Sequence, residues 1–340
     1  MDNYQKIKVV GKGTFGQAVL VKNKTDGKQY IMKQINITSM SDREKQEAMN
    51  EVNVLSGLKH PNIVQYITSF TAEGRLNIVM EYAECGDIYE KIKLQKGALF
   101  PEEQILDWFI QIALAVKYTH DKRILHRDLK TQNIFISKNN TIKLGDFGIA
   151  RVLKNTMECA KTLVGTPYYL SPELCQEKPY NNKSDIWSLG CVLYEMVTHK
   201  HAFEGASMKA LVGKILKGSY PPISSRYSSD LRDIIAKMLE KDPRTRPSIT
   251  SVLKAPFLQA RMRQLTAELD PSSPPTPSSQ IDAYRQPQEA VKRAPSAAQQ
   301  DRIDPAILRR KAEVDAIERL KQEKDRMKQE AMSRAKRQQE

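Results

Sequence analysis

One stretch constrains this chain more tightly than any other: His126-Arg127-Asp128-Leu129-Lys130-Thr131-Gln132-Asn133, followed further along by Asp146-Phe147-Gly148. Asp128 would orient a substrate hydroxyl and accept its proton, as a general base does. Lys130 would neutralise charge on a phosphoryl group in transit. Asn133 and Asp146 would supply oxygen ligands, which a hard cation such as Mg²⁺ prefers. The two strings together indicate phosphoryl transfer.

A glycine-rich string, GKGTFG at residues 11–16, precedes them. Such a string is weak evidence alone, because dinucleotide-binding folds carry it between a strand and a helix. Here strand-like runs flank it on both sides, which favours a flap over the phosphates of ATP, and glycines let the backbone approach an anion without Cβ clashes. The residues expected to line the nucleotide are Val10, Gly11, Lys12, Gly13, Thr14, Phe15, Gly16, Gln17 and Ala18.

The alternation of apolar residues predicts strands at 4–10, 18–22, 30–35, 63–70 and 76–81. Ser41 and Glu44 match a capping box that opens a helix ending near Leu58. Beyond Gly86 the apolar spacing becomes helical, with helices expected at 101–122, 184–197 and 247–258. The predicted fold is α+β with two lobes, a small five-stranded lobe with one helix and a larger, mainly helical lobe.

Lys33 lies on the third predicted strand and would hold the α- and β-phosphates as a point charge. A carboxylate on the first helix must position it. Glu47 and Glu51 lie one turn apart there, and helical periodicity alone does not choose between them.

The composition changes sharply near residue 265. Residues 265–303 are rich in Pro, Ser and Gln and are expected to form a disordered linker. The composition of residues 304–340 predicts a charged helix. This helix would either be solvated or associate weakly with the same helix of a second copy of the chain. Its incomplete heptad stripe consists of Ile307, Val314, Ile317, Leu320 and Met327.

The net charge is +14, but no run of Lys and Arg is long enough to predict nucleic-acid binding. The four cysteines lack metal-binding or CxxC spacing, which is typical of a cytosolic or nuclear protein with reduced thiols. We expect neither a signal peptide nor a membrane span, because no apolar run is long enough.

Three further strings carry a family resemblance: LGDFG at 144–148, GTPYYLSPE at 165–173 and KPYNNKSDIWSLG at 178–190. Over residues 4–258 the sequence resembles the eukaryotic protein kinases, and among them the NIMA-related (Nek) Ser/Thr kinases. The resemblance implies an Mg²⁺- and ATP-dependent kinase acting on Ser and Thr of protein substrates. Matching the spacing to HPNIV at 60–64 selects Glu51 as the partner of Lys33.

The same comparison implies a hinge in which the backbones of Glu81 and Ala83 pair with adenine. Met80 would be the gatekeeper, and Asp87 would meet the ribose. Leu55, Tyr66, His126 and Phe147 would form the stack that joins the lobes, and Tyr66 could instead swing inward and block the pocket.

Regulation is expected in the loop between Asp146 and Glu173. A phosphate on Thr162 would order this loop through Arg127, with Thr156 and Thr166 as alternatives, although Thr166 is better suited to contact Asp128 and Lys130. Glu173 is expected to pair with Arg246, and Asp185 to cap the backbone of the catalytic loop.

The alternative to an active kinase is a catalytically weak scaffold whose basic helical tail binds partners. Its signature would be the loss of Lys33, Asp128 or Asp146, and none is lost. By family analogy alone, the protein would be cytoplasmic and associated with the cytoskeleton, centrosome or cilium, with a role in the cell cycle.

Overall fold

The computed structural model describes residues 3–13, 16–146 and 167–269. They all belong to the first of two compact units, Met1–Tyr284, whereas the second unit, Arg285–Glu340, lies outside the described residues.

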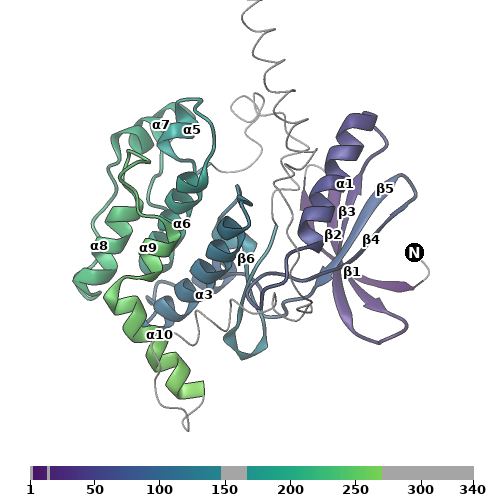
Figure 1. The fold of residues 1–340 in the computed structure, drawn as a ribbon, viewed down its shortest axis with the longest axis horizontal. Coiled ribbons are helices and arrows are strands. Elements are labelled where there is room, and N and C mark those ends of the chain that lie inside the picture. The colour runs from purple at the N-terminus through teal and green to yellow at the C-terminus, as the bar shows by residue number, and fades with distance from the viewer. Residues whose placement is uncertain (1–2, 14–15, 147–166, 270–340) are drawn as a thin grey trace, which may run out of the picture. The chain divides into compact units, whose positions relative to one another are not determined.

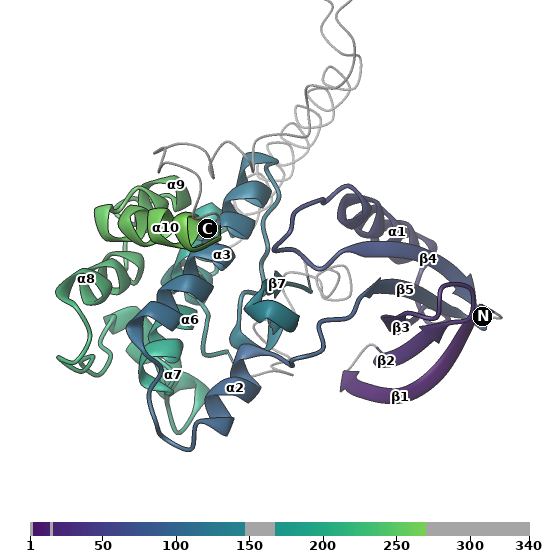
Figure 2. The same ribbon diagram turned by 90° about the horizontal axis from the view of Figure 1, so that it is seen from below.

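The N-terminal part is a five-stranded antiparallel sheet in the order β1-β2-β3-β5-β4 with one helix, α1 (Figures 1 and 2). The glycine-rich string lies at the β1–β2 connection, where Gly13 pairs with Gly16. The strands are β1 (Tyr4–Gly13), β2 (Gly16–Asn23), β3 (Gln29–Asn36), β4 (Tyr66–Ala72) and β5 (Arg75–Glu81), and α1 spans Asp42–Ser56.

The predicted capping box is present at the start of α1. The backbone N–H of Glu44 donates to Ser41 Oγ at 3.3 Å, and the backbone N–H of Ser41 donates to Glu44 Oε2 at 2.7 Å. Two orphan donors of the first turn are thereby satisfied, which fixes where the helix begins.

Apolar side chains cover both faces of the sheet. Ile35, Leu76 and Ile78 pack against Ala48 and Val52 of α1. On the opposite face lies a second cluster, made of Val19, Val21, Met32 and Val79. Since successive side chains of a strand point to opposite faces, neighbouring residues of β3 pack in different clusters.

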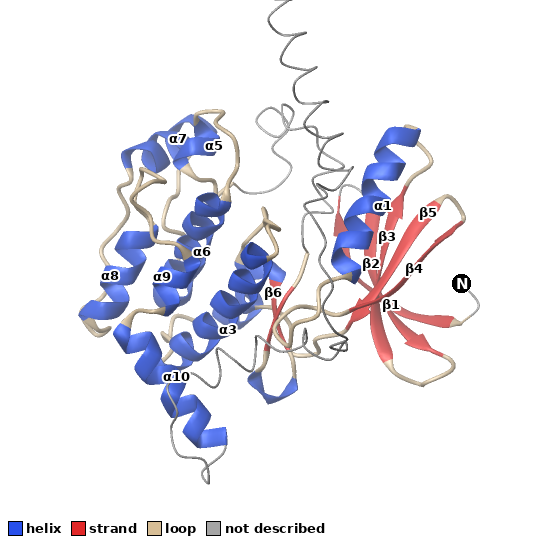
Figure 3. Ribbon diagram, viewed as in Figure 1, coloured by secondary structure: helices blue, strands red, loops and turns tan. Residues whose placement is uncertain are grey.

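The C-terminal part is mainly helical (Figure 3), and its core surrounds α3 (Glu102–Asp121) and α6 (Asn182–Thr198). Phe109, Trp187 and Phe203 are fully buried there, and burying such a side chain contributes roughly 1.5–3 kcal/mol. The other elements are α2 (Ile88–Leu94), η1 (Thr131–Asn133), β6 (Ile134–Ile136), η2 (Lys138–Asn140), β7 (Ile142–Leu144), α5 (Pro172–Cys175), α7 (Met208–Lys217), α8 (Ser229–Met238), α9 (Ile249–Leu253) and α10 (Pro256–Leu269).

Most element ends differ from the predicted ones by a few residues, and two differences have a structural cause or consequence. The fourth strand begins at Tyr66 rather than at residue 63, because Ile63 bridges in parallel to Leu144 of β7. The single helix expected at 247–258 is two helices, of which α10 continues to Leu269, beyond the expected start of the linker at residue 265. The rest of the linker and the tail at 304–340 lie outside the described residues. Within the described ranges no helix is long and apolar enough to cross a membrane.

Candidate active site

Lys33 and Asp146 come together from distant parts of the sequence. Lys33 lies on β3, where its register partners are Ala18 on β2 and Ile78 on β5. Asp146 comes two residues after β7. The Lys33 Nζ atom lies 3.1 Å from Asp146 Oδ1, and both side chains retain some exposure. The contact leaves a lysine and a carboxylate accessible to a charged ligand.

Two other predicted site residues, Lys130 and Asn133, contact Asp128. Lys130 Nζ lies 2.7 Å from Asp128 Oδ2. The Asn133 amide nitrogen donates to the same carboxylate oxygen at 2.9 Å and to the backbone oxygen of Asp128 at 2.8 Å. The backbone oxygen of Asn133 in turn accepts the N–H of Gly145 at 2.9 Å. This bond links Asn133 on η1 to the residue just before Asp146, the second candidate metal ligand.

Asp185, at the start of α6, holds the backbone of this loop as predicted. Its carboxylate accepts the N–H groups of His126 and Arg127, each at 3.0 Å, and contacts His120 Nε2 at 2.8 Å. Tyr180 Oη also donates to it. The fully buried carboxylate therefore fixes a loop in which Arg127 adopts a φ of 70°, a left-handed conformation that costs energy unless the surroundings enforce it.

His126 is buried and its two nitrogens have distinct partners. The N–H of Asp128 donates to Nδ1 at 3.3 Å, and Nε2 lies 2.9 Å from the carbonyl oxygen of Gly145. Since a carbonyl only accepts, Nε2 carries the proton and the ring is neutral. Burial lowers the pKa of His126, which agrees with a neutral ring.

The Asp146 carboxyl is kept ionised. Burial acts to raise its pKa, but the charge and hydrogen bond of Lys33 outweigh burial, and the pKa lies below its ordinary value. Asp146 has a φ of 53°, a second left-handed residue in the site. An ionised carboxylate at this position is suited to bind a cation.

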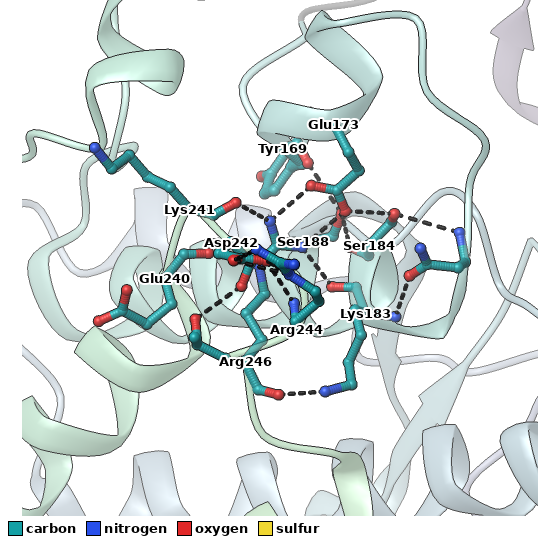
Figure 4. A network of polar contacts seen from close by, with 12 residues as sticks. Tyr169, Glu173, Lys183, Ser184, Ser188, Glu240, Lys241, Asp242, Arg244 and Arg246 are labelled. Atoms are coloured by element: carbon teal, nitrogen blue, oxygen red, sulfur yellow. Dashed lines mark hydrogen bonds and ion pairs between the residues drawn. The ribbon is translucent and has the colours of Figure 1, made fainter.

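The predicted pair of Glu173 and Arg246 is present and buried (Figure 4). Arg246 NH1 and NH2 donate to Glu173 Oε1 and Oε2 at 2.7 and 2.6 Å, and Ser184 Oγ donates to Oε1 at 2.6 Å. The guanidinium also lies 5.0 Å from the ring of Trp187. Burial acts to raise the pKa of Glu173, but the hydrogen bonds from Arg246 and Ser184 lower it overall. The pair is thus a charged, bidentate contact with its partners satisfied.

Comparison with known families agrees with this geometry. The family model described as "Protein kinase domain" matches residues 4–258. The chain belongs to the protein kinase family. The match ends at residue 258, whereas α10 continues to Leu269.

Curated kinases of the Nek group are similar to it over this domain. Identity is 58% over 264 residues to "Serine/threonine-protein kinase Nek1" of Mus musculus, covering 78% of this chain and 22% of that protein. It is 55% over 260 residues to Nek5 of Homo sapiens, covering 76% and 37%, and 52% over 257 residues to Nek4 of Mus musculus, covering 75% and 32%. The resemblance to Nek kinases is confirmed, and the chain spans well under half the length of these three relatives.

At the predicted hinge, the side chain of Glu81 contacts β7 of the larger lobe. Glu81 Oε1 lies 2.8 Å from Lys143 Nζ on β7, and Oε2 accepts the N–H of Gln65 at 3.1 Å. Ala83 is almost fully buried. Asp87 is the N-cap of α2, with Oδ1 accepting the N–H of Glu90 at 2.8 Å, and burial raises its pKa. Adenine and ribose contacts at these residues stay predictions.

Several predicted kinase residues cannot be placed. Glu47 and Glu51 lie one turn apart on α1, but their side chains are outside the described residues, so the partner of Lys33 on α1 stays a prediction. Tyr66 donates its hydroxyl to Ser69 Oγ at 2.8 Å and packs against the apolar cluster between the sheet and α1. Positions also outside the described residues are Thr14, Phe15, Phe147, Thr156, Thr162 and Thr166.

A polar cluster beside the catalytic loop was not predicted. The buried Glu195 of α6 accepts Tyr169 Oη at 2.5 Å and Thr131 Oγ1 at 3.2 Å. His201 Nδ1 lies 3.6 Å from the same carboxylate. The signal in the sequence was an acidic residue inside the apolar run of α6, because a carboxylate in such a position needs partners.

Proposed function

We propose that this chain transfers the γ-phosphoryl group of ATP to serine and threonine hydroxyls of protein substrates. The observation that carries the proposal is that Lys130 and Asn133 both lie within hydrogen-bond distance of Asp128, together with the contact of Lys33 and Asp146. These are the residue types that phosphoryl transfer requires, because its catalysis depends on positioning and on neutralising charge.

Each residue has a role that follows from its chemistry. Lys33 would hold the α- and β-phosphates, and the glycines at 11–16 would let the backbone approach them. Asp128 would orient the acceptor hydroxyl and take its proton, while Lys130, which already lies beside that carboxylate, would neutralise charge on the transferring group.

The donor set fits a magnesium ion. The amide nitrogen of Asn133 is committed to Asp128, so its amide oxygen faces away from that carboxylate and is the atom left for a cation. Asp146 stays ionised. When bound, Mg²⁺ would neutralise charge on the phosphates of ATP.

Activation through Thr162 is part of the proposal. Arg127 Nε is buried and has no hydrogen-bond partner among the described residues, an arrangement that is costly unless another group completes it. A phosphate on Thr162 would supply charge-assisted hydrogen bonds there. We expect Thr162→Ala to have much lower kinase activity than the wild type. Treating this variant with an upstream kinase should not restore the activity, because the acceptor hydroxyl is gone. If Thr162→Ala were as active as the wild type phosphorylated on Thr162, this switch would be excluded.

The scaffold alternative has no support, since every residue whose loss would mark it is retained. The roles of residues after 269, including self-association and targeting to the cytoskeleton, centrosome or cilium, remain proposals from the sequence. These roles are tested by deleting residues 270–340 and measuring both catalysis and localisation. Retained catalysis with lost localisation would show that the tail localises the kinase and is not needed for catalysis.

The proposed activity is tested by incubating the protein with labelled ATP, Mg²⁺ and an array of peptides containing Ser, Thr or Tyr. We expect label on Ser and Thr peptides, and none with Asp128→Asn. Label confined to Tyr, or equal labelling by Asp128→Asn, would overturn the proposal.

A further inference from the structure

Three amide side chains form a hydrogen-bonded row across the N-terminal sheet. Gln17 Nε2 on β2 donates to Gln34 Oε1 on β3 at 2.9 Å. Gln34 Nε2 then donates to Asn77 Oδ1 on β5 at 2.8 Å. The three residues are direct partners in the strand register. We call Gln17, Gln34 and Asn77 the amide row.

The direction of the amide row is fixed by the backbone. Asn77 Nδ2 donates to the carbonyl oxygen of Arg75 at 3.1 Å and lies 3.5 Å from that of Phe70. A carbonyl can only accept, so the nitrogen of Asn77 must face these two groups and its oxygen must face Gln34. Gln34 therefore presents its nitrogen to Asn77 and its oxygen to Gln17, and Gln17 must be a donor.

The inner two members of the amide row are buried, with exposures of 1% for Gln34 and 0% for Asn77. They lie on the sheet face opposite Lys33, because successive residues of a strand alternate between faces. They therefore cannot touch a nucleotide held at Lys33. Burying an amide costs free energy unless its hydrogen bonds are made, so losing any bond of the amide row should destabilise the sheet.

The outer end of the amide row lies beside the glycine-rich string. Gln17 directly follows Gly16, the last glycine of that string. A Cβ atom on Gly16 would come within 1.8 Å of the carbonyl oxygen of Gln34. The chain thus re-enters the sheet in close backbone contact with Gln34, at the point where the Gln17 side chain is held.

We propose that the amide row is a positioning device for the phosphate-binding loop, setting where β2 begins relative to β3 and β5. The inference rests on the proposed binding of ATP phosphates by residues 11–16. Gln17 acts in it as a positioning residue through its bond to Gln34. Without that bond, the start of β2 is held less firmly, and binding a nucleotide must order it.

The experiment compares the wild type with Gln17→Met, which keeps the length but removes the donor, and Gln17→Glu, which puts an acceptor opposite the oxygen of Gln34. Gln29→Met is the matched control, an exposed glutamine at the far end of the β2–β3 pair. The dissociation constant of ADP with Mg²⁺ is measured by calorimetry. The KM values for ATP and peptide, kcat and amide exchange at residues 16–18 are measured alongside.

We expect Gln17→Met to weaken ADP binding about three- to tenfold, as the loss of one neutral hydrogen bond would. Gln17→Glu should weaken it more, and both should speed exchange at residues 16–18. The KM for peptide should not change in either variant, and the control Gln29→Met should bind ADP as the wild type does. Normal ADP binding by both Gln17 variants would overturn the inference.

Gln34→Glu separates positioning from direct contact, because its side chain lies on the face away from Lys33. It keeps the acceptor for Gln17 but opposes the oxygen of Asn77, and we expect weaker ADP binding with an unchanged KM for peptide. Unchanged ADP binding by a folded Gln34→Glu would overturn the inference, because the bond from Gln34 to Asn77 would then have no part in positioning the loop. Failure of the wild type to bind ADP would instead contradict the proposed function.

Discussion

The Nζ atom of Lys33 lies 3.1 Å from Oδ1 of Asp146, although the two residues are 113 positions apart. The contact joins β3 of the N-terminal sheet to the segment that follows β7. The ammonium lowers the pKa of the carboxyl, although partial desolvation acts to raise it. The pair therefore connects two parts of the chain and favours the ionised form of the Asp146 carboxylate, which is the form that the predicted binding of Mg²⁺ needs.

Replacing Lys33 with Met should lower kcat for peptide phosphorylation by about 10²–10³-fold or more, because a preorganised positive charge at the phosphates is lost. Steady-state kinetics with a peptide substrate provide the measurement. Lys22→Met, on the exposed surface of β2, is the control and should retain activity. Equal kinetics for the two variants would contradict the role given to Lys33.

Removing one partner of the buried pair should destabilise the fold. Arg246→Met leaves the Glu173 carboxylate buried and unpaired, with an expected loss of about 3–5 kcal/mol in the free energy of unfolding. Urea denaturation measures it. Arg244 is the matched control, because it lies two residues away and pairs with Asp242 while its side chain is 89% exposed. Arg244→Met should change the urea midpoint little.

The double change Arg246→Met with Glu173→Met should recover part of that loss, because no buried charge remains. If Arg246→Met and Arg244→Met shifted the urea midpoint equally, the buried pair would have no special importance.

Stability should fall as the pH drops from 7 to 5. Burial and the charge of Lys143 lower the pKa of His60 to about 4, and its Nδ1 accepts the N–H of Asn62 at 3.0 Å, which requires an unprotonated nitrogen. Below the ordinary value of about 6.5 the unfolded chain binds a proton that the folded chain does not. The contribution is full above pH 6.5 and is lost progressively toward pH 4.

The size of this effect is at most on the order of 2 kcal/mol, since part of the ring lies near solvent. His126, whose pKa is also lowered, acts in the same direction. Urea midpoints at pH 7 and pH 5 should differ less for His60→Gln than for the wild type. An identical pH dependence in the two proteins would rule out His60 as a source.

The stable domain should extend through α10. Arg261 donates to Asp107 of α3 through Nε at 2.6 Å and NH2 at 2.9 Å, and Met262 is buried beside it. A chain ending at Leu258 should therefore melt below one ending at Leu269. Arg261→Ala should lose about 1–3 kcal/mol, as expected for charge-assisted hydrogen bonds. The exposed Arg263→Ala is the control, and a similar loss there would refute this assignment.

Local patterns predicted the parts of the fold that depend on neighbouring residues. The capping box of Ser41 and Glu44 is one example, since both its bonds lie within three positions. Distant contacts were predicted only where family resemblance supplied them, as for Glu173 and Arg246. The start of β4 was wrong by three residues because Ile63 is held by Leu144, far along the chain.

The amide row could not be predicted in this way. Its members are separated by 17 and 43 positions, and each is an ordinary polar residue in its own strand. Only the register of three strands brings them together. The end of α10 was missed for a similar reason, because Arg261 belongs to the domain through Asp107, a partner 154 positions earlier.

The anchoring of α10 on α3 also has a mechanical consequence. If residues after Leu269 attach the protein to a fixed support, a pull on them enters the folded part through α10. It is resisted where Leu265 and Met262 pack on the core and where Arg261 contacts Asp107. Asp107 lies on α3, outside the loop that carries Asp128. Tethering would then strain a helix pair while leaving the catalytic groups undistorted.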